Sequence, residues 1–554
     1  MKTTIVTACL SLTLMTCSHR ELATEMRPRL IVVVVVDQMR ADHLTRFASL
    51  FKYGFKRLLE RGTVFENAYH DHARTETGPG HATIATGVFP SHHGIVANNW
   101  IEYANLEKVY CCEDTARPIL GHPEAAKKSG RSPNRLLTST FGDWLKAASP
   151  QSKVFGVARK DRAAILSTGR SADGAFWFDL DDGDMVTSTY YRQSYPAWVI
   201  AFNKARLVDS YFGHVWRHSA SADAYRLVRE DDCPQENDGV ATTFPHTIAQ
   251  TSGEPDSHYY KELIKTPFSD EMVLRFARSL VEHEQLGTDS APDLLFVGCS
   301  AADAIGHAYG PFSHESLDYF LRLDKYLGDF FSYLDERIGA GRYLVVLSSD
   351  HGVLPIPETL TKQGLAAQRI SSRALRAELT PRLAEVTQQL GVSANLVARI
   401  LGPELYLNRE ALQNVQVSEP SLTTRLAEQL RGNGVVADVF TRQDLMGHTD
   451  GRPYLEAYRH SFHPQRSGDL VLRLQELCLR RTSPYGTSHG SPYDYDTHVP
   501  LVFMGAGLAS GRKSARVRTV DIAPTLAEII GVRATGTVDG RSLASNLAVL
   551  QKTD

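Results

Sequence analysis

The sequence predicts an α/β fold in which a wound, mostly parallel central sheet is flanked by helices. Two observations support this fold class. Uninterrupted apolar runs recur along the chain, and such runs are typical of strands buried on both faces. Between two of these runs, apolar residues recur with the period of a helix, as expected for the helix that connects two parallel strands. The runs are Leu30–Val36, Asp293–Cys299, residues 342–347 and residues 498–504.

The segments between these runs predict helices and two insertions. A helical pattern follows Asp37, at the end of the first run. Between the second and third runs, apolar residues recur every three or four positions, which predicts one long amphipathic helix. These residues are Leu317, Phe320, Leu323, Leu327, Phe330, Phe331, Leu334 and Ile338. Residues about 100–245 and about 355–485 interrupt the alternation, and we expect both to cap the sheet as insertions.

The first 24 residues resemble a secretory signal peptide, with Lys2 followed by an apolar stretch that ends at Met15. We therefore expect a periplasmic or secreted protein whose α/β domain spans residues 25–554. Cys17 offers lipidation as an alternative, although Thr16 stands where a smaller residue is usual before a lipidated cysteine. No later segment is long and apolar enough for a transmembrane span. We expect a monomer.

Composition supports a large apolar core and argues against a nucleic-acid partner. The 554 residues are 42% hydrophobic, and the net charge is −3. None of the seven cysteines forms a Cys-x-x-Cys pair. Cys299 and Cys478 lie in apolar stretches, which predicts core thiols. Export would permit a disulfide from Cys111 or Cys112 to Cys233, and the sequence leaves this pairing open.

Acidic residues and histidines lie next to the predicted strands, where ligands of open α/β sheets bind. Each has a structural alternative, such as a helix cap or a surface pair, but together they form a set of metal ligands. Carboxylate and imidazole ligands without thiolates suit Zn²⁺. Six ligands exceed the needs of one tetrahedral ion, so we expect two Zn²⁺ ions that share a substrate. The residues are Asp37, Asp303, His307, Asp350, His351 and His489.

The stretch RTETGPGHATIATG, residues 74–87, places Thr77 at a sharp turn before a predicted helix. A threonine there can serve as a helix cap. Its oxygen can also serve as a nucleophile if a metal ion activates it, because a helix N-terminus favours negative charge. The neighbouring histidines His81, His92 and His93 are interpreted as structural.

These motifs resemble the alkaline phosphatase superfamily, and within it the PafA-type periplasmic phosphate monoesterases. The resemblance is carried by Asp37, TGPGH at residues 77–81, DAIGH at 303–307, DHG at 350–352 and SHG at 488–490. It implies that Asp303, His307 and His489 hold one zinc ion. It also implies that Asp37, Asp350 and His351 hold the other, with the Thr77 oxygen as a further ligand. Thr77 would then be the nucleophile, forming a phosphothreonine intermediate.

The same resemblance implies that Asn98, Lys160 and Arg162 bind the oxygens of the substrate's phosphoryl group. A pair of cations is what the doubly charged phosphate monoester needs and a singly charged diester does not. We therefore expect small phosphate monoesters as substrates. A phosphodiesterase or nucleotide pyrophosphatase of the same superfamily is the alternative, and a zinc-binding scaffold without turnover is a second. The sequence argues against a sulfatase, whose nucleophile arises in a Cys/Ser-x-Pro-x-Arg motif, because TGPGH at residues 77–81 is not that motif.

Overall fold

The computed structural model describes residues 27–121, 130–249, 253–391, 395–413, 418–432, 434–447, 451–505 and 507–547. The expected signal peptide, with Cys9 and Cys17, lies outside these residues. Among the helices in the described part of the chain, none is long and apolar enough to cross a membrane.

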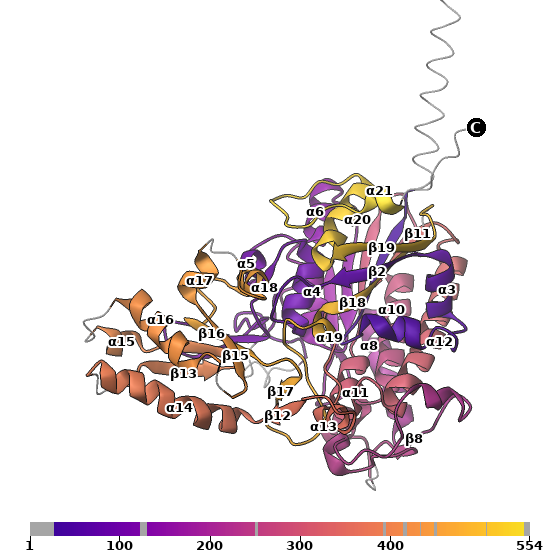
Figure 1. The fold of residues 1–554 in the computed structure, drawn as a ribbon. Helices are drawn as coiled ribbons and strands as arrows, with labels where there is room; N and C mark the ends of the chain where they lie inside the picture. Colours follow the sequence, from indigo (N-terminus) through magenta and orange to yellow (C-terminus); the bar gives the residue numbers. More distant parts are fainter. Residues whose placement is uncertain are drawn as a thin grey trace, which may run out of the picture.

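A nine-stranded sheet forms the centre of the molecule (Figure 1). Seven strands run parallel to one another, whereas β18 and β7 run antiparallel to their neighbours. The predicted fold class is therefore confirmed. The order across the sheet is β19 (Gly511–Arg518), β2 (Thr63–Tyr69), β18 (His498–Gly505), β11 (Tyr343–Ser348), β1 (Leu30–Val36), β10 (Asp293–Cys299), β5 (Val154–Ala158), β6 (Gly174–Phe178) and β7 (Met185–Val186).

Strand β1 is apolar throughout because helices cover both faces of the sheet. Val32, Val34 and Val36 face one hydrophobic core, and Ile31 and Val33 face the other. Each buried side chain contributes about 1.5–3 kcal/mol, so a polar residue on either face would be costly. Helices α3 (Gly54–Arg61), α10 (Phe268–His283) and α12 (His314–Arg337) contribute to the first core, and α6 (Phe141–Ala148) and α20 (Ile522–Ile530) to the second.

Helix α12 is the predicted amphipathic crossover, and it connects the regions of β10 and β11 on either side of β1. Its apolar residues, from Leu317 to Leu334, are buried in the first core. Ser313 caps its start by accepting a hydrogen bond from the Ser316 amide (3.0 Å). The periodicity therefore identified the helix correctly.

A smaller four-stranded sheet lies to one side of the central sheet, drawn in orange in Figure 1. Together with α14 (Ser372–Gln389) and α16 (Glu419–Leu430), it encloses a separate hydrophobic core. This region falls inside residues 355–485. Its strands are β13 (Val397–Leu401), β14 (Glu404–Leu407), β16 (Leu470–Leu474) and β15 (Val436–Thr441).

The expectation that residues 100–245 lie outside the sheet is wrong for β5, β6 and β7, which form one side of the central sheet. These strands are short, and Gly156 and Gly174 interrupt their apolar character. Gly156 is required by close packing, because a Cβ there would lie 2.6 Å from the Ala164 carbonyl oxygen. A tightly packed helix therefore hid this strand from pattern analysis.

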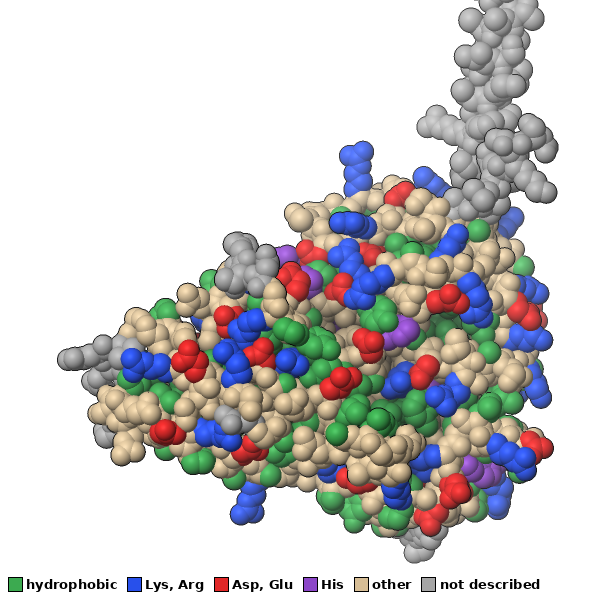
Figure 2. All heavy atoms as spheres, viewed as in Figure 1, with side chains coloured by type: hydrophobic (Ala, Val, Ile, Leu, Met, Phe, Trp, Pro, Cys, Tyr) green, Lys and Arg blue, Asp and Glu red, His purple; other side chains and the backbone are tan. Residues whose placement is uncertain are grey.

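The five cysteines in the described part of the chain are buried free thiols, so the disulfide considered above is not formed. Cys111 and Cys112 are adjacent in sequence, with their sulfur atoms 4.0 Å apart. Acidic and basic side chains are interspersed over the face shown in Figure 2.

Candidate active site

The predicted site residues gather at the carboxyl edge of the central sheet. Asp37 follows β1, and Asp350 and His351 follow β11. Asp303 and His307 lie on α11 (Ala301–Tyr309), which begins directly after β10. Parallel strands end at the same edge, so these residues converge although the chain separates them widely. His489 precedes β18, and it reaches the same edge because β18 runs antiparallel to β11.

Three buried carboxylates form the centre of the site. Lys160 lies between two of them, with its Nζ 2.5 Å from Asp37 Oδ2 and 2.7 Å from Asp303 Oδ2. The third, Asp350, accepts a hydrogen bond from the Gln38 amide (3.1 Å). Lys160 is the partner of Asp37 Oδ2, whereas Asp37 Oδ1 is buried without a hydrogen bond. Three carboxylates therefore share one close ammonium group, which leaves an excess of negative charge in a dry environment.

The three histidines present one ring nitrogen each to this centre. A backbone carbonyl lies within hydrogen-bond distance of every Nδ1: Thr487 O at 2.8 Å from His307, Gly352 O at 2.9 Å from His351, and Thr75 O at 2.6 Å from His489. A carbonyl can only accept, so each Nδ1 carries a proton, and in the neutral ring the Nε2 keeps its lone pair. Metal-binding histidines are commonly oriented in this way.

Two groups of side chains have the spacing of metal ligands. Asp37, Asp350 and His351 form one group, and Asp303, His351 and His489 form the other, each with its ligand atoms within 4.8 Å of one another. His307 belongs to neither group, although its Nε2 lies 3.2 Å from Asp303 Oδ1. A divalent cation would satisfy the unbonded Asp37 Oδ1 and the unbonded His351 Nε2. The two groups share His351, and their residues fit a divalent-metal centre.

Thr77 is the first residue of α4 (Thr77–Thr86), and Glu76, not Thr77, is the N-cap. The threonine is buried, with 1% of its surface exposed. Its hydroxyl oxygen accepts hydrogen bonds from Lys160 Nζ (3.1 Å) and Arg162 Nη2 (3.3 Å). The structure thus disfavours the capping interpretation and places an alcohol between two cations at the start of a helix.

Asn98 and Arg162 are held in place by their neighbours. The Asn98 side-chain oxygen accepts a hydrogen bond from the Gly78 amide (2.7 Å), which orients the amide nitrogen away from that contact. Arg162 lies on α7 (Asp161–Thr168), directly after β5, and its Nη1 donates to the Tyr110 hydroxyl (3.3 Å). Tyr110 in turn donates to Asp161 (2.5 Å). Both substrate-binding candidates are therefore preorganised.

Gln38 is a site residue that pattern analysis missed. Its backbone is left-handed, with φ of 67°, an uncommon conformation for a residue with a side chain. This conformation lets its amide donate to Asp350 while its side-chain nitrogen donates to Asp303 (2.9 Å). The DAIGH motif has Gly306 at the facing position, where a Cβ would lie 1.9 Å from Gln38 Oε1. The position of Gln38 directly after Asp37 was the available signal.

Two further residues support the ligands. His81 was interpreted as structural, and the structure places its Nδ1 3.0 Å from the Thr77 carbonyl and 3.3 Å from Asp350 Oδ2. Asp496 accepts hydrogen bonds from the amides of Gly490 (3.0 Å) and Ser491 (2.9 Å), which fixes the loop that carries His489. Nothing near Asp496 in the sequence distinguishes it from a surface residue, so only the fold reveals this role.

Burial and mutual repulsion set the charge states of the centre. Burial raises the pKa of Asp37 well above its ordinary value, and the carboxylates of Asp303 and Asp350 add to this effect. Burial acts in the same direction at Asp303, but His307 and Lys160 bring its pKa well below the ordinary value. Burial also lowers the pKa of His351 well below the ordinary value, which keeps its imidazole neutral. Strongly perturbed groups of this kind mark functional sites.

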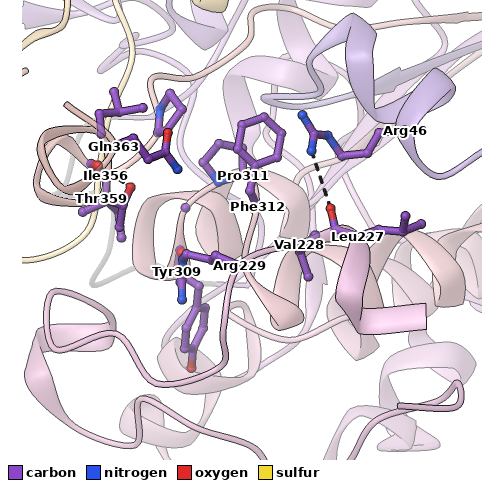
Figure 3. A pocket seen from close by; sticks show the side chains of 13 residues that line it. Arg46, Leu227, Val228, Arg229, Tyr309, Pro311, Phe312, Ile356, Thr359 and Gln363 are labelled. Carbon is purple, nitrogen blue, oxygen red and sulfur yellow. Dashed lines mark hydrogen bonds between the residues drawn. The ribbon is translucent and has the colours of Figure 1, made fainter. Parts of the chain in front are cut away.

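Two cavities differ in their relation to this centre. A cavity of about 80 Å³ is lined by His489 and by Arg480, so it joins the centre to β17 (Cys478–Arg480). A second, of about 470 Å³, is lined by Arg46, Arg229 and Phe312 and contains none of the predicted site residues (Figure 3). Of these two cavities, the smaller one is therefore in contact with a predicted site residue.

Comparison with known families matches residues 31–492 to the type I phosphodiesterase / nucleotide pyrophosphatase family, a range that contains every predicted site residue. The chain belongs to this family. The chain is also a PafA-like member of the alkaline phosphatase superfamily. A crystal structure of the alkaline phosphatase PafA superposes with a TM-score of 0.85 at 30% identity, over 94% of this chain and 98% of the other.

Two relatives show how far the likeness extends. Alkaline phosphatase PafA of Elizabethkingia meningoseptica is 32% identical over 92% of this PafA-like chain and 92% of its own length. A protein of Myroides odoratus named calcium-transporting ATPase is 36% identical over 96% of each chain. The resemblance identified from the motifs is confirmed.

Proposed function

We propose that the chain is a zinc-dependent alkaline phosphatase that hydrolyses phosphate monoesters through a phosphothreonine intermediate on Thr77. Three relatives named alkaline phosphatase, each covering at least 92% of the chain, support the general reaction, and the chain is a phosphoric monoester hydrolase. One observation carries the proposal of a zinc-activated Thr77 nucleophile. The Thr77 hydroxyl lies between Lys160 and Arg162, at the edge of the central sheet where the two groups of metal ligands meet.

Two Zn²⁺ ions are the proposed cofactors. Asp37, Asp350 and His351 would hold one, together with the Thr77 oxygen. Asp303, His307 and His489 would hold the other. When bound, the ions would lower the pKa of the threonine hydroxyl and of a water molecule and would neutralise charge on the leaving group. The excess of carboxylate charge and the oriented Nε2 lone pairs support this assignment.

The reaction would proceed in two displacements at phosphorus. The deprotonated Thr77 oxygen attacks the phosphorus, a new P–O bond forms, and the bond to the alcohol leaving group breaks. A water oxygen then attacks the same phosphorus, which releases inorganic phosphate and restores the threonine. Lys160, Arg162 and Asn98 would bind the non-bridging oxygens, where positioning and electrostatics supply most of the catalysis.

The cations favour a monoester over a diester. Lys160 and Arg162 both reach the Thr77 oxygen, so a phosphoryl group attacked by Thr77 would meet two positive charges. A monoester carries two negative charges on that group and a diester carries one, so the pair is of greater use to the monoester. Phosphodiester hydrolysis is the second candidate, and it is favoured by the family model.

Replacement of the nucleophile tests the proposal. We expect Thr77→Ala to lower the turnover of p-nitrophenyl phosphate by about 10³-fold or more while the bound zinc stays near that of the parent protein. Thr86→Ala is the matched control, because Thr86 lies on the same helix and its hydroxyl donates within that helix to Ala82 (2.6 Å). Undiminished turnover by Thr77→Ala would rule out Thr77 as the nucleophile.

The purified parent protein also tests the substrate class and the predicted export from the cytoplasm. We expect the parent protein to hydrolyse p-nitrophenyl phosphate faster than bis-p-nitrophenyl phosphate, and the reverse order would favour the diesterase. We also place the enzyme in the periplasm or outside the cell, since residues 1–24 have the pattern of a signal peptide. Mass spectrometry of the mature N-terminus would detect its removal.

A further inference from the structure

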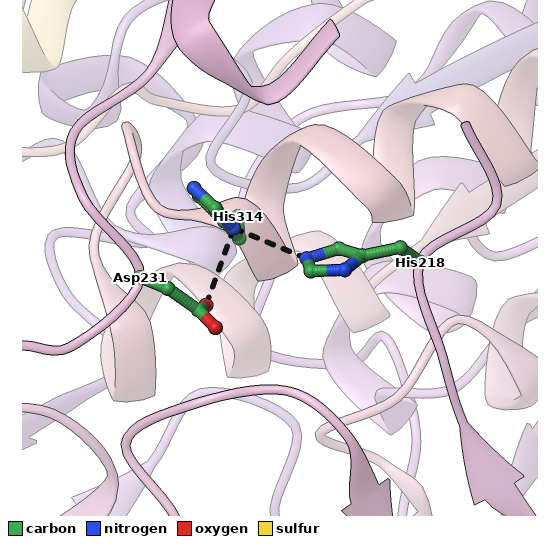
Figure 4. Close-up of side chains that lie close together, drawn as sticks. All are labelled: His218, Asp231 and His314. Carbon is green, nitrogen blue, oxygen red and sulfur yellow. Dashed lines mark hydrogen bonds and ion pairs between the residues drawn. The ribbon is translucent and has the colours of Figure 1, made fainter. Parts of the chain in front are cut away.

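A second cluster of metal-ligating side chains lies outside the site described above. It consists of His218, Asp231 and His314, whose ligand atoms all lie within 4.8 Å of one another. His218 follows β8 (Val215–Trp216), Asp231 lies in the loop beyond it, and His314 is the first residue of α12. Figure 4 shows the three side chains converging from these separate segments. We refer to them as the loop cluster.

Two of the three ligand-to-ligand distances in the loop cluster match the edge of a zinc coordination tetrahedron. His314 Nδ1 lies 3.1 Å from His218 Nε2 and 3.3 Å from Asp231 Oδ1. Ligands at about 2.0–2.1 Å from a tetrahedral zinc ion are separated by roughly 3.3 Å. Two histidines and one carboxylate also form a common zinc ligand set, with the fourth position left for water.

Hydrogen bonding alone does not satisfy these three atoms. Asp231 Oδ1 is buried and accepts no hydrogen bond from the described residues. The His314 Nδ1 can carry at most one proton, so it can donate either to Asp231 or to His218 but not fully to both. If His218 Nε2 instead donates to His314 Nδ1, the Asp231 Oδ1 lies opposite an unprotonated nitrogen and receives no hydrogen bond from it. A cation at the centre would accept all three lone pairs and remove the conflict.

The surroundings hold the loop cluster in this arrangement. The His218 ring contacts the rings of Tyr225 and Phe244, with both centroid distances at 4.1 Å. The other oxygen of Asp231 accepts a hydrogen bond from the Phe244 amide (3.0 Å). His218 is exposed, whereas the other two residues are half-buried, so an ion can enter from solvent. The ligands are therefore oriented by their neighbours, as in established metal sites.

We propose that the loop cluster is a further divalent-metal site, of the Zn²⁺ class, with three protein ligands and an open fourth position. The ion would join the loop that follows β8 to the start of α12. That helix follows α11, the helix that carries Asp303 and His307, so the ion would also stabilise the approach to the sheet edge. The proposal rests on the loop cluster alone and does not depend on the function assigned to Thr77.

Zinc counting tests this site. The full-length mature protein is equilibrated with Zn²⁺, freed of unbound metal by gel filtration, and analysed for zinc per chain by mass spectrometry. We expect His218→Ala and Asp231→Asn each to bind one zinc ion fewer per chain than the parent protein. His258→Ala is the matched control, since His258 is an exposed histidine outside every metal-ligand group, and it should bind as much zinc as the parent.

The comparison is a difference between variants, so it is independent of how many ions the sheet edge holds. Asp231→Asn keeps the shape of the side chain and the acceptor for Phe244, which guards against misfolding. As a second measurement, zinc is removed from the parent protein and from His218→Ala with a chelator, and Co²⁺ is added to each. The visible absorption of tetrahedral Co²⁺ should show one more bound ion per chain in the parent protein than in His218→Ala. Equal zinc content and equal cobalt spectra in parent and variants would overturn the proposal.

Discussion

Buried carboxylates at the edge of the central sheet differ from those in the smaller sheet in what surrounds them. Asp37, at the edge, pairs with Lys160 (2.5 Å) through Oδ2, but its Oδ1 is buried without a hydrogen bond and it lies among other carboxylates. Asp469, next to β16, is equally buried, but it accepts hydrogen bonds from the Leu407 amide (2.8 Å) and from Arg409 (2.5 Å). The fold therefore satisfies the charge of Asp469 more fully than that of Asp37.

This difference separates structural charge from functional charge. A buried carboxylate that is paired and hydrogen-bonded keeps the chain in one arrangement, whereas an unsatisfied one is tolerated only when a ligand compensates it. The sheet edge should therefore respond to substitution through activity and metal content, and the smaller sheet through stability. The following experiments test this division.

The largest effect is expected at the metal ligands. Asp303→Asn removes a charge that the proposed ion needs. Turnover of p-nitrophenyl phosphate should fall by more than about 100-fold, because residues that only hydrogen-bond to metal ligands already cost up to about that factor when they are replaced. The measurement is steady-state turnover together with bound zinc. Asp469→Asn is the matched control, because it makes the same change at a buried carboxylate of the smaller sheet. The Asp469→Asn protein that folds should have the specific activity of the parent protein. Equal losses in the two variants would remove the contrast.

A smaller and more selective effect is expected at Lys160. Lys160→Ala should lower monoester turnover by about 10²- to 10³-fold, since one donor to the transition state is lost, and should lower diester turnover less. The readout is the ratio of the two rates. Lys146→Ala is a suitable control, because Lys146 pairs with Asp173 (2.9 Å) away from the site. A uniform loss on both substrates would show that Lys160 does not read the charge of the phosphoryl group.

The smaller sheet should respond through stability. Asp469→Ala leaves the buried Leu407 amide without its acceptor, so we expect the free energy of unfolding to fall by about 1–3 kcal/mol. Urea denaturation measures this, and the exposed Glu410→Ala should stay within about 0.5 kcal/mol of the parent. A loss of turnover without a loss of stability in Asp469→Ala would contradict the division.

The smallest effect is expected at a surface pair. Asp539 accepts a hydrogen bond from His92 (2.8 Å), and this bond raises the pKa of His92 above 6.5. A raised histidine pKa stabilises the fold fully below pH 6.5, and the stabilisation is lost as the pH rises through the folded-state value. The pair is solvent-exposed at His92, so its contribution should be about 0.2–1 kcal/mol.

Asp539→Asn tests this sign, since asparagine keeps an acceptor for the Phe89 amide. The difference in melting temperature between parent and variant should be largest below pH 6.5 and should shrink as the pH rises. A difference that does not change with pH would show that the pair contributes no charge interaction.

Local patterns in the sequence determined the parts of this protein that depend on nearby residues. Leu30–Val36 is apolar at every position, which is sufficient to predict a strand covered on both faces, and the three- and four-residue spacing in α12 is sufficient to predict its buried side. The ligand residues could be found because each lies in the segment directly before or after a predicted strand. Their grouping into two ions came from the family resemblance.

Tertiary structure decided what depends on close approach between distant segments. Gly156 hides β5 from pattern analysis, and only the packing of α7 against it explains the glycine. The left-handed turn at Gln38 joins Asp303 to Asp350, and the antiparallel course of β18 brings His489 to the same edge. The two contacts of Gln38 cross 312 and 265 residues, so no local pattern specifies them. Steric fit and unsatisfied charge become visible only when the chain is folded.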